Sequence, residues 1–312
     1  MAEFDYLQRF SFDGLPIRGQ WVRLQQVVRE ATAQQTTYPA PVLTSLAQQF
    51  AAVAMFADNL KFQGAVALQS RGEGALQRSL AECREQHKLR GIAHLNPTTS
   101  APVGADDLRA WLGSGAQLAL TLIYPEEANT EPYQGLIALS EPTLAANLET
   151  YFAQSEQLPT KLFFSDFDPK TETVTGLLIQ KLPDPEGATE VDLEEYAEAW
   201  QAAQQLAATL SLEELVTLTP ERLLHRLFNE FPVRLHPPRA LHFECSCSRQ
   251  KSDRTLRVVP EAELYEILDE LGEISVDCEF CGARYRYDRV DLMALLKQSK
   301  QQPARDSDPT LH

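Results

Sequence analysis

Cys245-Ser246-Cys247 is followed, after thirty residues without a cysteine, by Cys278-Glu279-Phe280-Cys281-Gly282. These two motifs hold four of the five cysteines of the chain. A C-x-C pair and a C-x-x-C pair in a chain without a secretory signal predict one tetrahedral zinc site of four thiolates rather than a disulfide framework. Residues two apart in a strand face the same side, so Cys245 and Cys247 can both reach one ion. Gly282 can adopt the positive φ that a tight C-x-x-C turn needs.

The same four sulfurs are open to oxidation. Once a metal leaves, the sulfurs of Cys245 and Cys247 are near enough to join, although the small ring is strained and therefore easily reduced. Thiolates that bind a metal are also the groups that an oxidant attacks. The residues by themselves leave two interpretations open, a zinc site that only holds a small domain together and a zinc site that an oxidant can dismantle.

Further sequence blocks accompany the cysteines. Near them lie Phe231-Pro232-Val233-Arg234, Phe243 to Arg249, and Gly272-Glu273-Ile274. Earlier in the chain, in this order, come Ile17-Arg18-Gly19, Leu89-Arg90-Gly91-Ile92-Ala93, Tyr133-Gln134-Gly135, and Tyr151-Phe152 with Ser155-Glu156-Gln157-Leu158-Pro159-Thr160. Together with the cysteine spacing, these blocks resemble the heat-shock protein 33 family, the redox-regulated bacterial chaperones, over nearly the whole chain.

The resemblance implies a function. A member of this family is an ATP-independent holdase of the stress response and not an enzyme. It is inactive while it is reduced and holds one Zn²⁺ per chain. After oxidation, zinc release and unfolding of a linker, it binds unfolding client proteins and prevents their aggregation. The resemblance also implies a monomer in the reduced form and a homodimer in the oxidised, active form.

The resemblance implies site residues as well. Cys245, Cys247, Cys278 and Cys281 match the zinc ligands of the family. On oxidation, Cys245 would bond to Cys247 and Cys278 to Cys281.

Composition limits the partners of the chain. The sequence carries 44 acidic and 28 basic residues, a formal net charge of −16. This excess disfavours binding to nucleic acid or to an anionic membrane. The acidic start Met1-Ala2-Glu3-Phe4-Asp5 lacks a basic region followed by an apolar run, and no stretch reaches the roughly 20 apolar residues of a membrane span. We therefore expect a cytoplasmic protein with no nucleic-acid or membrane partner.

The order of helical and strand-like patterns predicts an α+β fold. A long, alanine-rich apolar run at Val42–Leu60 is typical of a buried helix, and the strand-like runs around it follow one another rather than alternating with helices. We expect a largely antiparallel sheet with packed helices in an N-terminal domain, residues 1–183. An acidic helical linker (184–240), a zinc-binding redox-switch domain (241–300) and a disordered tail (301–312) complete the predicted organisation.

The predicted linker differs in composition from its surroundings. From Pro183 through Glu221 there are ten acidic residues and no lysine or arginine. Six apolar residues recur at helical spacing and form one face: Leu193, Tyr196, Trp200, Ala203, Ala207 and Leu210. Like charges four residues apart, such as Glu190 and Glu194, weaken a helix by about 0.2–0.5 kcal/mol per pair. We expect this helix to persist only while it is docked, although composition alone equally allows a solvated linker helix without a switching role.

The zinc-binding domain has a predicted order of short elements. These are a strand at Thr255–Val259, a helix at Glu261–Leu271 that Gly272 ends, strands at Ile274–Cys278 and Ala283–Tyr287, and a helix at Val290–Lys297. Structural zinc sites contribute about 10–16 kcal/mol of apparent binding energy. A domain this small is therefore expected to unfold when the ion is lost.

Two functions from other classes remain open at the level of sequence. Cys278 and Cys281 could form the C-x-x-C of a thiol–disulfide oxidoreductase, but no βαβ pattern surrounds them. Arg284-Tyr285-Arg286-Tyr287 has the basic and aromatic residues that zinc ribbons use to bind nucleic acid. The surrounding stretch, Leu241–Arg289, holds eleven acidic against seven basic residues, which disfavours that function.

The remaining candidate residues have ordinary interpretations. Cys83 is isolated and is expected to be a packed or surface thiol. His242 lies close to Cys245, but four thiolates already complete a zinc shell. His87 and His94 have no serine, cysteine or aspartate at a spacing that would indicate a catalytic triad.

Overall fold

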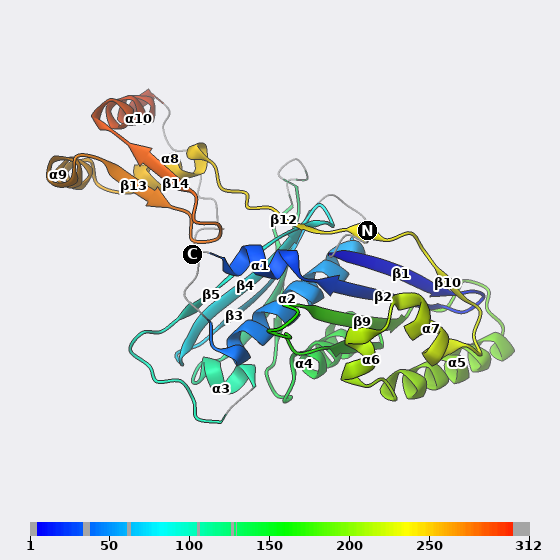
Figure 1. The fold of residues 1–312 in the computed structure, drawn as a ribbon. Helices are drawn as coiled ribbons and strands as arrows, with labels where there is room; N and C mark the ends of the chain where they lie inside the picture. The colour runs from blue at the N-terminus through cyan, green and yellow to red at the C-terminus, as the bar shows by residue number, and fades with distance from the viewer. Residues whose placement is uncertain are drawn as a thin grey trace. The chain divides into compact units, whose positions relative to one another are not determined.

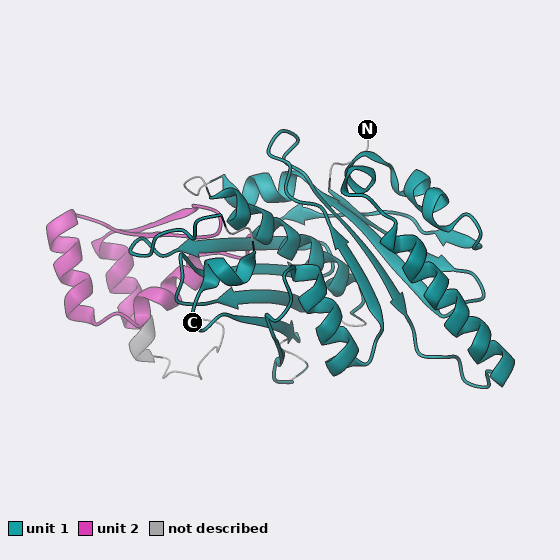
Figure 2. Cartoon of the chain, turned by 90° about the horizontal axis from the view of Figure 1, so that it is seen from below, with its two compact units in different colours: residues 1–244 teal, residues 245–312 magenta. Residues whose placement is uncertain are grey.

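The computed structural model describes residues 5–33, 38–60, 64–104, 107–125, 128 and 130–301. The chain divides into two units, residues 1–244 and 245–312 (Figure 2). The predicted disordered tail, residues 301–312, lies outside the described residues apart from Gln301, which ends a helix.

The first sheet of the larger unit has the strand order β10-β1-β2-β9-β8, with β11 paired to β1 (Figure 1). Its strands are β1 (Tyr6–Phe12), β2 (Ile17–Leu24), β8 (Thr160–Phe164), β9 (Val174–Lys181), β10 (Val233–Leu235) and β11 (Arg239–Ala240). All of these pairs are antiparallel. Two strands that begin the chain thus lie beside segments that follow them by more than 150 residues.

The second sheet has the order β12-β5-β4-β3-β6-β7. Its strands are β3 (Ala65–Arg71), β4 (Leu76–Arg84), β5 (Lys88–Leu95), β6 (Gln117–Ile123), β7 (Tyr133–Ile137) and β12 (His242–Phe243). The pairs are antiparallel except β12 with β5, which is parallel. The predicted α+β fold with a largely antiparallel arrangement is confirmed, with two sheets in place of one.

Helix α2 (Ala40–Asp58) packs against strands of both sheets and forms the centre of the largest core cluster. It begins directly after Pro39, whose fixed φ suits a helix start, and the eight alanines and large apolar residues of its second half are buried almost completely. By length and hydropathy it could cross a membrane, but 72% of the apolar window is buried inside the protein. Within the described residues it is the one helix that meets this criterion, and its burial is that of a core helix.

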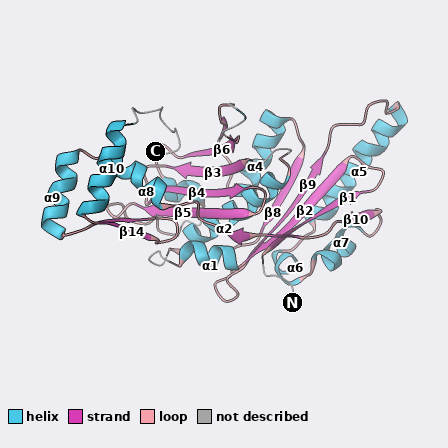
Figure 3. Ribbon diagram, turned by 90° about the horizontal axis from the view of Figure 1, so that it is seen from above, coloured by secondary structure: helices cyan, strands magenta, loops and turns pink. Residues whose placement is uncertain are grey.

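Shorter helices complete the N-terminal part: α1 (Gln26–Thr32), α3 (Leu108–Leu112), α4 (Leu144–Tyr151) and a one-turn π-helix, η2 (Phe152–Glu156). The side chains of Asp107 and Thr143 cap α3 and α4 by accepting backbone N–H bonds from Ala110 and Ala146. Figure 3 shows α1 and α4 beside the strands of the larger unit.

The acidic segment forms three helices, α5 (Glu190–Ala208), α6 (Leu212–Thr217) and α7 (Pro220–Phe228). Thr189 with Asp192, and Ser211 with Glu214, form capping boxes that start α5 and α6. The three helices cover the face of the first sheet that is opposite to α2. Alternation along β9 shows this, because Leu178 belongs to the α2 core while Leu177 and Ile179 belong to the cluster of the acidic helices.

The predicted apolar face of α5 is docked over most of its length. Trp200, Ala203 and Ala207 are buried, and Tyr196 and Leu210 are half-buried. Leu193 was predicted to lie on the same buried face, but it is 40% exposed. The first turns of α5 therefore lie on the surface, and the docked face begins near Tyr196.

The second unit contains α8 (Arg249–Arg257), α9 (Glu261–Leu271), β13 (Ile274–Asp277), β14 (Arg284–Tyr287) and α10 (Arg289–Gln301). Gly272 ends α9 with φ 80°, as predicted. The core of this unit consists of seven buried apolar side chains: Leu256, Leu264, Leu268, Ile274, Tyr287, Leu292 and Leu295. A core of this size is small for a domain that must fold alone.

One predicted element of the second unit is wrong. Thr255–Val259 was expected to be a strand because of its β-branched composition, but Thr255 to Arg257 form the last turn of α8. The Ser248 hydroxyl caps this helix by accepting from Lys251 N, and Ser252 and Leu256, four residues apart, supply its buried face. Helix capping and packing thus outweigh the local β preference of the sequence.

Candidate metal centre

The four cysteines of the two motifs come together in the second unit. Their sulfur atoms all lie within 4.8 Å of one another, and each side chain is half-buried. Cys245 Sγ lies 3.6 Å from Cys278 Sγ, and Cys247 Sγ lies 3.4 Å from Cys281 Sγ. Four thiolates at about 2.3 Å from a tetrahedral zinc ion are about 3.8 Å apart. Donor type and spacing therefore both fit a Zn²⁺ site of four cysteines.

The C-x-C half of the cluster lies between β12 and α8 in a segment without regular secondary structure. A strand is thus not what brings Cys245 and Cys247 to one side, although both sulfurs do reach the cluster. The segment is held at its C-terminal end by the start of α8, where Ser248 is the capping residue.

The C-x-x-C half forms the turn between β13 and β14. Cys278 N donates to Ala283 O at 2.8 Å, and Gly282 N donates to Cys278 O at 2.8 Å. Gly282 has φ 69°, the positive value predicted for this position. At the base of the turn the Arg284 guanidinium makes two bonds to the Asp277 carboxylate, at 2.7 and 2.8 Å. The hairpin therefore presents Cys278 and Cys281 on a closely hydrogen-bonded turn.

One tyrosine touches the sulfur cluster. Tyr285 Oη donates to Cys247 Sγ at 3.1 Å. Partial burial acts to raise the pKa of Cys247, but hydrogen bonds from Tyr285 and from the neighbouring thiols outweigh it and lower that pKa. Burial raises the pKa of Cys245 and, to about 11, that of Cys281. The hydrogen bonds thus favour the thiolate form of Cys247. A bound divalent cation would favour the thiolate form of the other three cysteines as well.

Sequence reasoning missed the role of Tyr285. From the sequence, the Arg-Tyr-Arg-Tyr run is part of a predicted strand and a possible nucleic-acid surface, and neither prediction assigns Tyr285 to the metal site. The structure pairs Arg284 with Asp277 and places Arg286 Nε 3.7 Å from Glu273 Oε1, so acidic neighbours neutralise the two arginines. Strand alternation was the available signal, because Tyr285 and Tyr287 point to one face of the hairpin and the arginines to the other.

The other candidate residues belong to the larger unit, residues 1–244. Cys83 lies in β4, is fully buried in the α2 core, and its pKa is raised by burial. His242 packs its ring 5.1 Å from that of His87. His94 Nε2 lies 3.3 Å from Arg78 Nη2. Within the part of the chain that the structure describes, the four cysteines are the one group of three or more His, Cys, Asp or Glu that could hold a metal.

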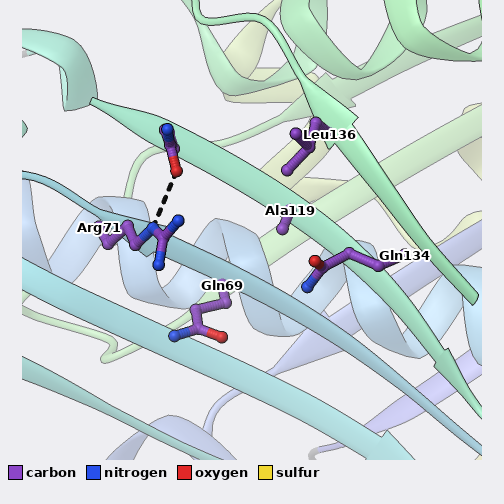
Figure 4. Close-up of a pocket in the computed structure, with 6 residues that line it drawn as sticks. Gln69, Arg71, Ala119, Gln134 and Leu136 are labelled. Atoms are coloured by element: carbon purple, nitrogen blue, oxygen red, sulfur yellow. Dashed lines mark hydrogen bonds between the residues drawn. The ribbon is translucent and has the colours of Figure 1, made fainter. Parts of the chain in front are cut away.

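A shallow pocket lies on the open face of the second sheet (Figure 4). It is lined by Gln69, Arg71, Gln117, Ala119, Gln134 and Leu136, and Arg71 Nε donates to Gln117 Oε1 at 2.8 Å. Amides, one guanidinium and two apolar side chains supply neither a nucleophile nor a general base. This lining does not form a catalytic site.

Comparison with known proteins shows the family of the chain. The model of the Hsp33 protein family matches residues 5–288. The chain belongs to the Hsp33 family. The 33 kDa chaperonin of Chromobacterium violaceum is 35% identical over 307 residues, which cover 98% of this chain and 99% of that protein. The 33 kDa chaperonin of Pseudomonas aeruginosa strain LESB58 is 38% identical and covers 95% of each chain.

A solved structure shares the fold. The crystal structure of the 33 kDa chaperonin (heat shock protein 33 homolog) from Thermotoga maritima superposes with a TM-score of 0.79 at 22% identity, covering 95% of this chain and 99% of that one. Membership of the Hsp33 family and its match to the 33 kDa chaperonins make this chain a chaperone and not an enzyme, so the oxidoreductase alternative is wrong.

Proposed function

We propose that this Hsp33 chain is a redox-regulated, ATP-independent holdase whose four clustered cysteines hold one Zn²⁺ in the reduced, inactive form. The observation that carries the proposal is the convergence of four sulfurs within 4.8 Å from two separate motifs. Cys245, Cys247, Cys278 and Cys281 would bind the ion as thiolates, and the ion would neutralise their charge while it holds the two motifs together.

The second unit has few other means of staying folded. Its core contains seven buried apolar side chains, and small cores of this kind need a metal or disulfides to be stable. The cysteine cluster joins the segment before α8 to the β13–β14 hairpin, two parts separated by thirty residues. Loss of this connection is expected to unfold the unit.

Oxidation would remove the ligands. Hydrogen peroxide transfers one oxygen to a thiolate, which becomes a sulfenic acid, and hydroxide is released. A second thiolate then attacks the sulfenic sulfur, displaces another hydroxide and forms the disulfide. We propose the pairs Cys245–Cys247 and Cys278–Cys281. The sulfur–sulfur contacts at 3.6 and 3.4 Å, Cys245 with Cys278 and Cys247 with Cys281, run between the motifs. The proposed pairs would thus separate the two motifs instead of locking them together.

The acidic segment is suited to respond to oxidation and zinc loss by leaving its docked position. We propose that residues 184–240 act as a linker region apart from residues 1–183. Glu190 and Glu194, and Glu194 and Glu198, are like charges one turn apart on α5, and such pairs weaken an isolated helix. Its docked face is apolar, so release would expose the buried cluster that α5–α7 share with the first sheet.

That exposed surface would hold unfolding client proteins and prevent their aggregation. The family resemblance supports two further parts of the proposal, a cytoplasmic location and a change from a reduced monomer to an oxidised homodimer.

One paired measurement tests the proposal. The freshly reduced protein should contain about one zinc per chain, and peroxide with mild warming should release it while the protein begins to suppress the aggregation of a denatured client. Light scattering and a chromophoric zinc indicator follow both events in the same sample. Zinc release without any suppression of aggregation would support a purely structural zinc site instead.

A further inference from the structure

The segment between the acidic helices and the first cysteine lies along the edges of both sheets. We call residues 232–244 the strap. Its strands β10 and β11 extend the first sheet beside β1, and β12 extends the second sheet beside β5. Further backbone bonds join the strap to both edges: His236 N donates to Arg9 O at 2.9 Å, and Glu244 N donates to Leu89 O at 2.9 Å. Without the strap, β1 and β5 would be the edge strands.

The strap binds as an extended peptide with alternating apolar side chains. Val233 and Leu235 pack against the cluster of the acidic helices. Leu241 is 5% exposed within the α2 core, and Phe243 packs against that core. Each pair is two residues apart, so in each sheet one side of the strap is apolar. The two edges thus accept an extended segment with an apolar residue at every second position.

Three prolines of the strap flank β10 and β11, the two strands that cover the edge of β1. Pro232, Pro237 and Pro238 carry no N–H, and proline is tolerated at the margin of a sheet because no partner follows there. An edge strand that lacks prolines or charges is otherwise a template for pairing with another chain. The strap therefore protects two edges that are long enough to pair, since β1 has seven residues and β5 has eight.

The strap itself is held by very short strands and by a few side-chain bonds. Its strands have three, two and two residues. Arg239 Nη1 lies 2.8 Å from the buried carboxylate of Asp58, at the end of α2, and donates to Gln86 Oε1 at 2.7 Å. Glu244, the residue before Cys245, is held by Lys88 Nζ at 3.2 Å. A segment that pairs along the whole of β1 or β5 would form more backbone bonds than the strap does.

We propose that the edges of β1 and β5, once the strap has left them, bind extended segments of unfolded polypeptide by strand addition. The strap is then an internal substitute for the client in the reduced protein. Backbone hydrogen bonds supply affinity for any sequence, and the two apolar edges favour segments with apolar residues at alternate positions. This inference rests on the proposed holdase function and names the surface that the function would use.

Hydrogen–deuterium exchange of the full chain tests the proposal. The protein is compared in three states: reduced, activated by peroxide with mild warming, and activated in the presence of reduced, carboxymethylated lactalbumin, a permanently unfolded protein. Amides in peptides that cover residues 6–13 and 87–95 should exchange slowly, then fast, then slowly again. Fast exchange at both edges in the complex would overturn the proposal.

A backbone variant separates strand addition from side-chain contacts. Arg9 O accepts from His236 N of the strap, and Asp13 N donates to Pro232 O at 2.8 Å. Every second residue of a strand turns its N–H to the same edge, so the N–H of Ser11, midway between Arg9 and Asp13, also faces the strap. Ser11→Pro removes this N–H, whereas Ser11→Ala keeps it. Client affinity of the activated S11P protein should be about tenfold below that of S11A. Equal affinity of the two folded variants would contradict strand addition at β1.

Three further outcomes of the exchange experiment separate failure of the edge proposal from failure of the holdase function. If the edges regain slow exchange without client, in a manner that depends on protein concentration, the occupant is a second copy of this chain and the proposal is wrong. If the activated protein does not bind lactalbumin at all, the holdase function itself fails. If it binds lactalbumin while both edges continue to exchange fast, only the inference about the edges fails.

Discussion

At the scale of single residues, the hydroxyl of Tyr285 is a hydrogen-bond donor to the sulfur cluster from outside the two cysteine motifs. It donates to Cys247 Sγ at 3.1 Å. Partners of this kind orient a ligand and reduce its reactivity, and their loss costs about 10- to 100-fold in metal affinity. Tyr285→Phe should therefore lower zinc affinity by about tenfold and speed zinc release by peroxide. Competition with a chromophoric chelator measures the first effect and stopped-flow indicator absorbance the second.

Tyr287→Phe is the matched control for Tyr285→Phe. Tyr287 is buried in the same unit and donates to Asp253 Oδ1 at 2.8 Å rather than to a sulfur. Its substitution should lower the thermal stability of the unit with a smaller change in the rate of zinc release. Equal release rates for Y285F and the unsubstituted protein would show that the hydroxyl does not protect the thiolate.

Two arginines of the strap allow a comparison between a buried and an exposed ion pair. Arg239 faces the Asp58 carboxylate, whose side chain is 1% exposed, whereas Arg234 faces Asp13, which is 43% exposed. Arg239→Gln removes one charged partner of this buried carboxylate and leaves Arg9 at 3.7 Å and Gln20 at 2.8 Å, so the larger unit should lose about 2 kcal/mol of unfolding free energy. Arg234→Gln should cost less than about 1 kcal/mol.

Urea unfolding followed by tryptophan fluorescence measures both losses. All three tryptophans, Trp21, Trp111 and Trp200, lie in the larger unit, so the signal reports on that unit. Similar losses of unfolding free energy in R234Q and R239Q would mean that Arg239 of the strap does not stabilise the buried carboxylate of Asp58.

At the scale of elements, helix α5 depends on its docked face more than on its own propensity. It carries uncompensated acidic residues, and Trp200, 8% exposed, is its largest buried side chain. Trp200→Ala removes a large apolar contact worth about 3–5 kcal/mol. The reduced, zinc-loaded variant should therefore be cleaved by protease within residues 190–208 and bind some client before any oxidation. Limited proteolysis and light scattering measure the two changes.

Leu193→Ala is the control for Trp200→Ala, since Leu193 lies on the same helix and was predicted on the same face but is 40% exposed. It should leave protease resistance and client binding almost unchanged. A W200A protein that stays resistant and inactive while reduced would show that docking of α5 does not hold the chaperone inactive.

At the scale of the whole molecule, the two units should respond differently to loss of metal. A strong chelator under reducing conditions should unfold residues 245–301 and leave the larger unit folded, because that unit has its own large core around α2. Far-UV circular dichroism should report the loss of α8–α10, while tryptophan fluorescence stays near its native value. Added zinc should restore the signal. An unchanged dichroism spectrum in metal-free protein would contradict the dependence of the unit on zinc.

Local signals along the chain were sufficient for several features. The positive φ of Gly282 and the end of α9 at Gly272 each depend on a few neighbouring residues, and the structure agrees with both predictions. The two cysteine motifs are equally local signals, and the structure brings them together in one group that could hold a metal. The long helix α2 was predictable because a long, alanine-rich apolar run is typical of a buried helix, and the α+β class because strand-like runs follow one another rather than alternating with helices. The sequence by itself therefore determined the candidate site and the class of fold.

Tertiary structure decided the rest, because burial and pairing depend on residues that are far apart in the chain. Thr255 looks like a strand residue until packing within its own unit makes it part of α8. Leu193 matches the helical period of Trp200, but the first turns of α5 lack a covering partner among the described residues. The strap pairs with β1 across more than 220 residues, and no local pattern specifies such a partner.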